Sequence, residues 1–486
     1  MSGMFDDFKE QVRSQANIVE IISEYVPLKK RGGSFWGCCP FHGEKTPSFS
    51  VTPDKNFFYC YGCHVGGDVF TFVMKMENCT FPEALKLLAN KLGIAVPEKE
   101  KTKAELEREK QAKQVIAANE LATRFFQACL TKTDYGIKAQ EYLTGRGITP
   151  EIIERFSIGV ALPNYNALLS ALGKRGCSAG LLVQAGLAVN YDRGPMDKFR
   201  GRVMIPIQDP RGHVVGFGGR ILEQNSQQMA KYMNTGETEW FNKRTLLFGM
   251  NVALKEIKKR RQAVIVEGYM DAISLHAAGI DWAVASMGTA FAQEQAKLLA
   301  RAADEVVFSY DSDAAGQRAT VRAVSIAKEA GLKVRVLIVP DGKDPDEFVR
   351  KHGKDAYLRL IETAVSGIEF QMQYVISQNN VSNLAGKVEA VSNILPFLLE
   401  CKNEIEVAQH IKTLAQRLTI DEGLIMSEYR KLSRKNDRRE AVSKWQVQPN
   451  VLSAEDLAEQ LLLYVILKNT DLALVYRDKI DSVGFM

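Results

Sequence analysis

The 486-residue chain is poor in cysteine and has no long apolar run, and both absences narrow its class. Eight cysteines are too few for a disulfide-stabilised extracellular scaffold. No uninterrupted apolar stretch approaches the roughly 18 residues of a membrane-spanning helix, and the acidic start at residues 1–7 lacks the apolar core of a secretion signal. We therefore expect a monomeric, cytoplasmic protein with no membrane partner.

A P-loop for nucleotide phosphates is also absent. Gly-Lys occurs at positions 173, 342, 353 and 386, where the next residue is Arg, Asp, Asp and Val instead of the Ser or Thr that the motif requires. This excludes a fused helicase motor of the P-loop type. The net charge of +5 is mildly basic, so it permits an anionic partner without requiring one.

Cysteine and histidine are concentrated near the start of the chain. Cys39-x₂-His42 is followed, after 17 residues, by Cys60-x₂-Cys63, and two such ligand pairs can meet around one tetrahedral Zn²⁺. Four protein ligands would close the shell, which indicates a structural ion. Cys38 and His64 adjoin these pairs, and Cys39 is preferred because it makes the two spacings equal.

Apolar runs and helical stretches alternate in the second half of the chain, which predicts a parallel sheet with helical crossovers. The expected strands and helices come in turn at 263–266, 272–278, 282–285, 292–302, 305–310, 314–330 and 334–339. Glu267 directly follows the first of these strands, and Asp311 and Asp313 follow the third.

These three acids predict a divalent metal site. Ligands bind beyond the carboxyl ends of parallel strands, and two like charges about 4 Å apart cost roughly 4 kcal/mol at an effective dielectric near 20. A cation removes that cost, and oxygen ligands suit Mg²⁺ and chemistry on phosphates. Asp311 or Asp313 could instead cap the following helix. Asp271, Asp344 and Asp346 are second-tier candidates, because acids at helix starts also stabilise the helix dipole.

Several motifs together resemble a known family. Glu-Gly-x₂-Asp at 267–271 with Asp-x-Asp at 311–313 is similar to the TOPRIM domain of bacterial primases, topoisomerases and some nucleases. Residues 37–49 resemble the zinc ribbon of bacterial replicative primases of the DnaG type. Blocks of the primase catalytic core are resembled at 142–147, 199–204, 216–220 and 231–234, so the resemblance covers about residues 1–430.

The resemblance implies a DNA-dependent RNA polymerase that makes short RNA primers on single-stranded DNA at replication forks, from ribonucleoside triphosphates. Glu267, Asp311 and Asp313 would hold two Mg²⁺ or Mn²⁺ ions, supported by Asp271, Asp344 and Asp346. Template and nucleotide phosphates would be bound by Arg146, Arg200, Arg202, Arg220, Lys231 and Lys243. The zinc ribbon would hold the template strand and help to choose the start site.

The expected architecture is a multidomain α+β chain. A zinc-binding domain at 1–100 and a charged linker at 101–115 precede a basic α+β subdomain at 116–255. A linker is preferred to an exposed helix because the charged segment has no apolar stripe. The TOPRIM parallel-sheet subdomain at 256–350 is followed by a helical subdomain at 351–430, a second linker at 431–452 and a helical segment at 453–486. That last segment resembles only the beginning of the helicase-binding domain of such primases, so docking of a replicative helicase is in doubt.

Two rival functions are weaker. A topoisomerase or nuclease could use the same metal domain, but none of the fifteen tyrosines has a setting that marks it as a strand-passing nucleophile. A non-catalytic adaptor that binds zinc and DNA would have no need of the central block rich in Arg and Gly.

Overall fold

The computed structural model describes residues 2–445, apart from 78–79, 98–101, 223–229, 289, 341–343 and 402. The chain divides into two compact units, one ending at Tyr374 and the other beginning at Val375. No helix in the described ranges is both long and apolar enough to cross a bilayer.

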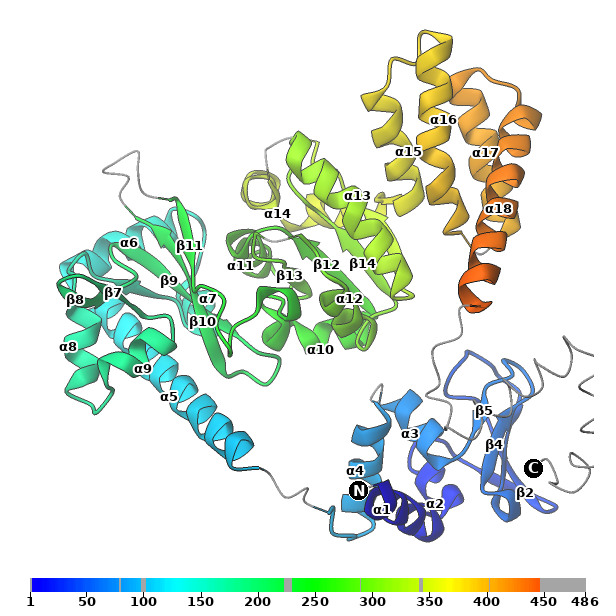
Figure 1. Cartoon of the computed structure of the whole chain (residues 1–486), viewed down its shortest axis with the longest axis horizontal. Helices are drawn as coiled ribbons and strands as arrows, with labels where there is room; N and C mark the ends of the chain where they lie inside the picture. Colours follow the sequence, from blue (N-terminus) through cyan, green and yellow to red (C-terminus); the bar gives the residue numbers. More distant parts are fainter. Residues whose placement is uncertain are drawn as a thin grey trace, which may run out of the picture. The chain divides into compact units, whose positions relative to one another are not determined.

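An antiparallel sheet with four helices forms the N-terminal region (Figure 1). Its strands pair in chain order: β1 (Lys29–Arg31), β2 (Ser34–Gly37), β3 (Phe49–Thr52), β4 (Phe57–Cys60) and β5 (Gly66–Gly67). The helices are α1 (Ser2–Gln15), α2 (Ile18–Ser23), α3 (Val69–Met76) and α4 (Phe81–Lys91). Phe49, Phe58 and Phe72 are fully buried at its centre, so these aromatic rings form the core of the small domain.

The charged segment 101–115 was expected to be a linker. That prediction was wrong, since most of the segment is helical. α5 runs over Lys103–Lys132, and its first buried residue is Val115. A capping box starts the helix: Thr102 Oγ1 accepts from the Glu105 N–H at 3.2 Å, and Glu105 Oε2 accepts from the Thr102 N–H at 2.7 Å. The sequence correctly indicated that this segment buries no apolar stripe, but capping and good helix formers suffice without one.

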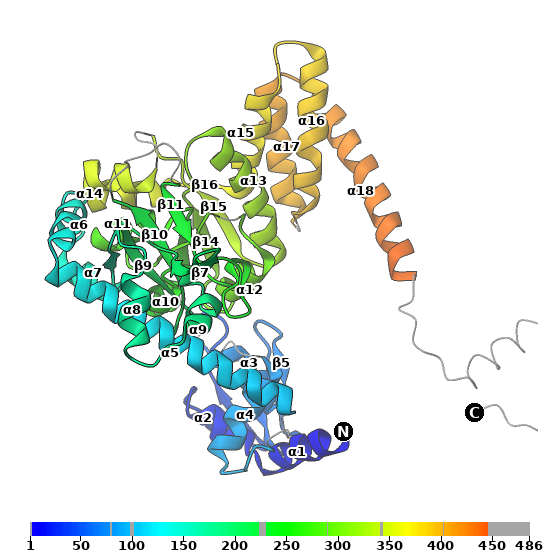
Figure 2. The same ribbon diagram turned by 60° about the vertical axis from the view of Figure 1, so that its left-hand side comes forward.

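The basic subdomain is built on a four-stranded antiparallel sheet in the order β11-β10-β9-β6. These strands are Tyr232–Asn234, Val214–Ile221, Arg202–Gln208 and Gly159–Ala161. α5, α8 (Ala167–Gly173) and α9 (Ala179–Gln184) pack together on one face (Figure 2). The rest of the subdomain consists of α6 (Asp134–Thr144), α7 (Pro150–Arg155) and the hairpin of β7 (Ala188–Tyr191) and β8 (Gly194–Asp197).

The second sheet confirms the predicted parallel arrangement. Its order is β13-β12-β14-β15-β16, and the first four strands are parallel. The strands β12 (Gln262–Val266), β13 (Ala283–Ala285), β14 (Glu305–Phe308) and β15 (Lys333–Val336) lie within one or a few residues of the predicted ranges. The last strand, β16 (Val365–Ser366), pairs antiparallel with β15 and was not expected, because residues 351–430 were predicted to form a helical subdomain.

Helices cover both faces of this sheet. The connection through α11 (Tyr269–Ala277) leads from β12 to β13, whereas α12 (Gln293–Ala300) and α13 (Ala314–Glu329) lead the chain in the opposite direction across the sheet. Right-handed crossovers therefore place α11 on the other face from α12 and α13. α14 (Pro345–Glu362) packs beside α11, and α10 (Met250–Arg260) precedes β12. The direction changes between β12 and β14, and a ligand is expected at that switch point.

One hydrophobic core joins this sheet to the basic subdomain. It includes Val203 and Ile205 from β9 together with Val264, Ile265 and Val307 from the parallel sheet, all fully buried. The two subdomains are thus fixed against each other by packing, so side chains from both can face a common cavity.

The second unit is helical over its described residues. α15 (Gly367–Gln378) spans the boundary and is followed by α16 (Leu384–Leu399), α17 (Glu404–Leu418) and α18 (Glu422–Trp445) (Figure 1). α18 covers residues 431–445, so this part of the second expected linker is helix. The remainder of that linker and the expected segment at 453–486 lie outside the described residues.

Candidate metal and nucleic-acid sites

The four predicted zinc ligands come together. Cys39 and His42 follow β2, while Cys60 ends β4 and Cys63 lies in the next turn. Their ligand atoms all lie within 4.8 Å of one another, with Cys39 Sγ 3.8 Å from Cys63 Sγ and Cys60 Sγ 3.7 Å from His42 Nδ1. Sulfur ligands about 2.3 Å from a tetrahedral Zn²⁺ lie roughly 3.8 Å apart. The geometry therefore fits one closed, structural zinc site.

The neighbouring candidates do not belong to this cluster. Cys38 is exposed, and His64 Nδ1 is hydrogen-bonded to the Tyr59 hydroxyl at 3.1 Å. Glu44 instead supports the ligands: its carboxylate lies 3.3 Å from His42 Nε2 and accepts from the Cys39 N–H at 2.6 Å. An acid on the far nitrogen orients a histidine ligand and fixes its tautomer.

Zinc binding should fail when Cys60 is replaced by Ser, because a hydroxyl is a poor substitute for a thiolate ligand. We expect Cys60→Ser to lose its zinc in atomic absorption measurements. Cys38→Ser is the matched control and should keep a full equivalent of zinc. Unchanged zinc content in Cys60→Ser would contradict the assignment.

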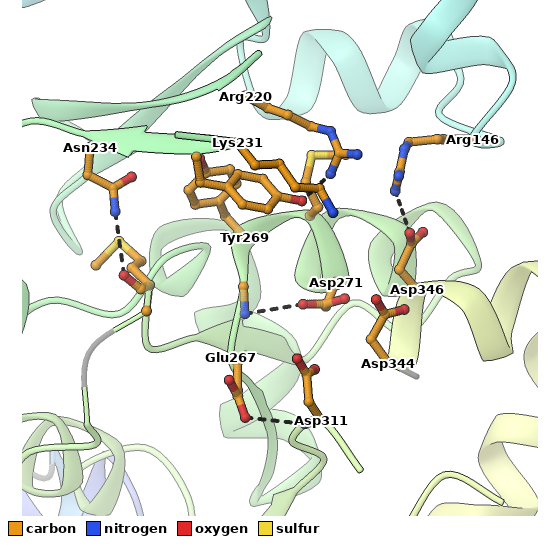
Figure 3. A pocket seen from close by; sticks show the side chains of 15 residues that line it. Arg146, Arg220, Lys231, Asn234, Glu267, Tyr269, Asp271, Asp311, Asp344 and Asp346 are labelled. Atoms are coloured by element: carbon orange, nitrogen blue, oxygen red, sulfur yellow. Dashed lines mark hydrogen bonds and ion pairs between the residues drawn. The ribbon is translucent and has the colours of Figure 1, made fainter. Parts of the chain in front are cut away.

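A second site lies where β12 and β14 end. A cavity of about 280 Å³ opens there (Figure 3), and its acidic wall consists of Glu267, Asp271, Asp311, Asp344 and Asp346. Glu267 Oε1 accepts from the Asp311 N–H at 3.2 Å. The start of α13 lies against both residues, since a Cβ on Gly316 would be 2.2 Å from the Asp311 carbonyl oxygen and 2.8 Å from Glu267 Oε1. Only glycine permits this approach.

Burial and mutual repulsion disfavour the charged forms of these acids. Burial, and then the charge of Asp311, raise the pKa of Glu267 to about 7. Burial and the charge of Asp344 raise the pKa of Asp311 to about 6 and that of Asp271 well above its usual range. Such a group of carboxylates favours a cation. Their oxygens are less tightly grouped than the zinc ligands, which alone in the described ranges form a set within 4.8 Å.

Asp313 and Asp271 both do structural work at helix starts. Asp313 is exposed and outside the cavity lining, and its Oδ1 caps α13 by accepting from the N–H groups of Ala315 at 2.9 Å and Gly316 at 2.8 Å. Asp271 is buried and accepts from the Gly268 N–H at 3.2 Å. The capping roles that the sequence left open are therefore real, and metal binding by these two acids stays a prediction.

The opposite wall of the cavity is basic. Arg146, Arg220 and Lys231 reach it from the basic subdomain (Figure 3), and phosphate binding by these three residues stays a prediction. The Arg220 guanidinium lies 5.2 Å from the ring centroid of Tyr142 and 5.1 Å from that of Tyr232, and its Nη1 donates to the Tyr232 hydroxyl. The aromatic rings therefore hold a cation in the wall without neutralising it.

The other predicted basic residues do not line the cavity. Arg200 stacks over exposed Tyr165 at 4.9 Å, and Lys243 begins the short 3₁₀ turn Lys243–Thr245. The prediction that Arg202 binds a phosphate is wrong, because only 1% of this residue is exposed. Its guanidinium donates to the backbone carbonyls of Ala230 at 2.8 Å and Gly219 at 3.2 Å, so Arg202 holds the sheet together and is not available to a phosphate.

Residue-by-residue prediction missed three uncharged polar side chains in this cavity: Tyr232, Asn234 and Tyr269. Tyr232 and Asn234 stand two apart on β11, and side chains at that spacing share one face of a strand. This alternation was the available signal once 231–234 had been noted as a block. Asn234 Nδ2 donates to the Met287 carbonyl at 3.5 Å, while the Met287 N–H donates to the Glu267 carbonyl at 2.9 Å, so this side chain is linked to the acidic wall.

The raised pKa values predict a pH-dependent effect of metal on stability. Protons bind the acids more tightly in the folded state than in the unfolded state, so the metal-free protein loses stability as pH rises from about 4.5 to 7. A cation binds the ionised form and should restore that stability. Differential scanning calorimetry should show Mg²⁺ raising the Tm by a few degrees at pH 8 and much less at pH 5.5. An equal shift at both values would contradict a site built on these carboxylates.

Four family models match successive parts of the chain. They describe a CHC2 zinc finger at residues 4–104, the N-terminal domain of the DNA primase catalytic core at 125–254, a Toprim-like domain at 264–349 and the DnaB-helicase binding domain of primase at 368–423. The doubt about a helicase-binding domain was therefore wrong, since the model matches described helices that precede the segment at 453–486.

Relatives span most of the chain. A DNA primase of Clostridium acetobutylicum is 39% identical over 98% of this chain and 79% of its own length. A DNA primase of Haemophilus influenzae is 36% identical over 85% of this chain and 70% of its own. Among solved structures, the zinc-binding and RNA polymerase domains of the Aquifex aeolicus primase match with a TM-score of 0.54 and 31% identity, over 86% of this chain and 99% of theirs. A DnaG primase catalytic domain bound to single-stranded DNA matches with a TM-score of 0.57 and 34% identity, over 65% of this chain and 99% of its own.

A zinc ribbon, a basic subdomain and an acid-lined parallel sheet define a nucleotidyltransferase that works on a nucleic-acid template. The chain belongs to the family of bacterial DNA primases. It is accordingly a DNA-directed RNA polymerase that synthesises RNA primers, and neither a topoisomerase nor a non-catalytic adaptor.

Proposed function

We propose that primer synthesis takes place in the cavity between the two subdomains. Glu267 and Asp311 would hold the divalent ions there, and Asp313 would complete the set of metal ligands. The supporting observation is the pairing of walls: acids at the sheet's switch point face Arg146, Arg220 and Lys231 across about 280 Å³. A phosphate between them would contact cations on one side and metal ions on the other. Neither wall alone could bind a polyphosphate and neutralise its charge as the two walls do together.

Bond formation would join the 3′-oxygen of the growing RNA to the α-phosphorus of the incoming ribonucleotide, while the bond to the β-phosphate oxygen breaks and pyrophosphate leaves. When bound, two Mg²⁺ or Mn²⁺ ions would lower the pKa of the attacking hydroxyl and neutralise charge on the leaving group. Glu267 and Asp311 would hold these ions as ligands. Arg220, held by its contacts with Tyr142 and Tyr232, and Lys231 would bind and orient the phosphates.

The zinc ribbon offers a surface suited to single-stranded template. The three residues of β1, Lys29, Lys30 and Arg31, are all exposed, and Tyr61 is 61% exposed while stacked on Trp36 at 5.7 Å. Basic side chains attract the phosphate backbone, and aromatic faces stack on bases of any sequence. We assign template holding and start-site choice to this surface, with one structural Zn²⁺ maintaining its shape.

The helices matched at 368–423 are proposed to dock a replicative helicase. The catalytic work would then take place at the replication fork, in the cytoplasm, where the helicase exposes single-stranded template. Binding of purified helicase can be measured separately from primer synthesis, so this assignment does not depend on the metal site.

Replacement of Asp311 by Ala should abolish primer synthesis, since it removes a ligand at the centre of the acidic wall. The assay is template-directed incorporation of ribonucleotides on single-stranded DNA with Mg²⁺ or Mn²⁺, and we expect a loss of at least about 100-fold. Thermal stability and affinity for DNA should be largely retained. Asp355→Ala, which removes an exposed acid on α14, should leave activity unchanged. Full activity in Asp311→Ala would remove the assignment.

A further inference from the structure

The carboxylate of Asp346 is already saturated with donors. Its Oδ1 accepts from Ser274 Oγ at 2.6 Å and from Arg350 Nε at 2.9 Å. Its Oδ2 accepts from Arg146 Nη1 at 2.5 Å and from Arg350 Nη2 at 3.3 Å. An ionised carboxylate offers about four lone-pair positions. Those of Asp346 are used by a hydroxyl and two guanidinium groups, and only 4% of the residue is exposed.

Asp344 stands two residues away in a different electrostatic setting. Its Oδ1 accepts from the Glu347 N–H at 2.8 Å to cap α14, and among the described residues no Arg or Lys pairs with it. Its charge raises the pKa values of both Asp271 and Asp311, whereas the charge of Asp346 raises only that of Asp271 and to a smaller extent. Asp346 has two positive partners, and a cation there would have to displace them.

The partner that matters for the cavity is Arg146. It lies in the turn after α6, its side chain is 19% exposed, and its guanidinium stacks on the Tyr142 ring at 5.2 Å. Figure 3 shows Arg146 entering from the basic subdomain and meeting Asp346 at the edge of the acidic wall. The guanidinium fork carries several N–H donors, so the bond to Asp346 leaves others for a bound phosphate.

We propose that Asp346 is a positioning residue, which ties the Arg146 guanidinium to the start of α14 so that it presents its donors to a phosphate in the cavity, and that Asp346 is not a ligand of the catalytic metal ions. This inference rests on the proposed function of the cavity. The phosphate can belong to the incoming ribonucleoside triphosphate or to the template strand, and both are bound through the same chemistry.

The test compares Asp346→Asn with Asp344→Asn in the full-length protein. Mn²⁺ binding is followed by electron paramagnetic resonance without nucleotide or DNA, and KM and kcat are measured for synthesis. Asp346→Asn should bind Mn²⁺ with wild-type stoichiometry and affinity, while Asp344→Asn should bind it at least about tenfold more weakly. Weakened Mn²⁺ binding in Asp346→Asn would overturn the proposal. Normal Mn²⁺ binding in both variants and in Asp311→Ala would instead refute the proposed metal site.

The effect on phosphate binding is tested with Arg146→Gln and with the double variant Asp346→Asn/Arg146→Gln. Asp346→Asn should raise KM for ribonucleotides, or the Kd for single-stranded DNA measured separately, by roughly tenfold with a smaller change in kcat. The arm that changes identifies the phosphate. Arg146→Gln should have a similar effect, and the double variant should be no worse than either single variant, because Asp346 acts through Arg146. Additive effects would overturn the proposal.

The double variant controls for misfolding caused by unbalanced charge. Asp346→Asn leaves two guanidinium groups beside a neutral amide and can lower stability, whereas the double variant Asp346→Asn/Arg146→Gln removes one charge of each sign. If the single variant does not fold, Mn²⁺ binding is measured on the double variant. Wild-type binding there supports the positioning role, and loss of an ion contradicts it.

Discussion

Repulsion among buried carboxylates at one edge of a parallel sheet is the constraint on which the rest of the catalytic region depends. β12 and β14 end side by side at the switch point, and the chain places Glu267 and Asp311 there, joined through the Asp311 N–H. Burial and neighbouring charge raise the pKa values of both acids. An arrangement that costs folding free energy in the metal-free state has a physical explanation if a cation is its normal occupant. Gly316 allows the next helix to close over this site, since any side chain there would strike Asp311 or Glu267.

The basic subdomain complements this edge. Its β9 shares a hydrophobic core with the parallel sheet, so Arg146, Arg220 and Lys231 are held opposite the acids by packing. The two arginines are held in this wall by different contacts. Arg220 lies close to two tyrosine rings, whereas Arg146 is tethered to Asp346, an acid beside the proposed metal site. The proposed mechanism uses both walls of the cavity, because the same triphosphate would contact metal ions on one side and guanidinium groups on the other.

Local features of the sequence were sufficient to predict much of this. Continuous apolar runs gave the parallel strands and hence the position of Glu267 and Asp311, and ligand spacing identified Cys39 over Cys38. Features that depend on distant partners were not predictable. Arg202 looks like other arginines of its block, but its donors are used by carbonyls of β10 and the segment before β11. Asp346 reads as one acid among several, yet its partner Arg146 is 200 positions earlier. The helix at 103–115 was not predicted because a helix that depends on its cap needs no hydrophobic periodicity. The two-residue strand β16 was not predicted because pairing at a sheet edge leaves no such pattern either.

The most direct test of the central claim is anomalous diffraction from crystals of the protein soaked in Mn²⁺ at pH 8. The account predicts manganese peaks in direct bonding contact with the carboxylates of Glu267 and Asp311, and Asp346 still bonded to Arg146 with no ion against it. Manganese bound elsewhere, with Glu267 and Asp311 left uncoordinated, would contradict the claim that this edge of the sheet is built around divalent cations.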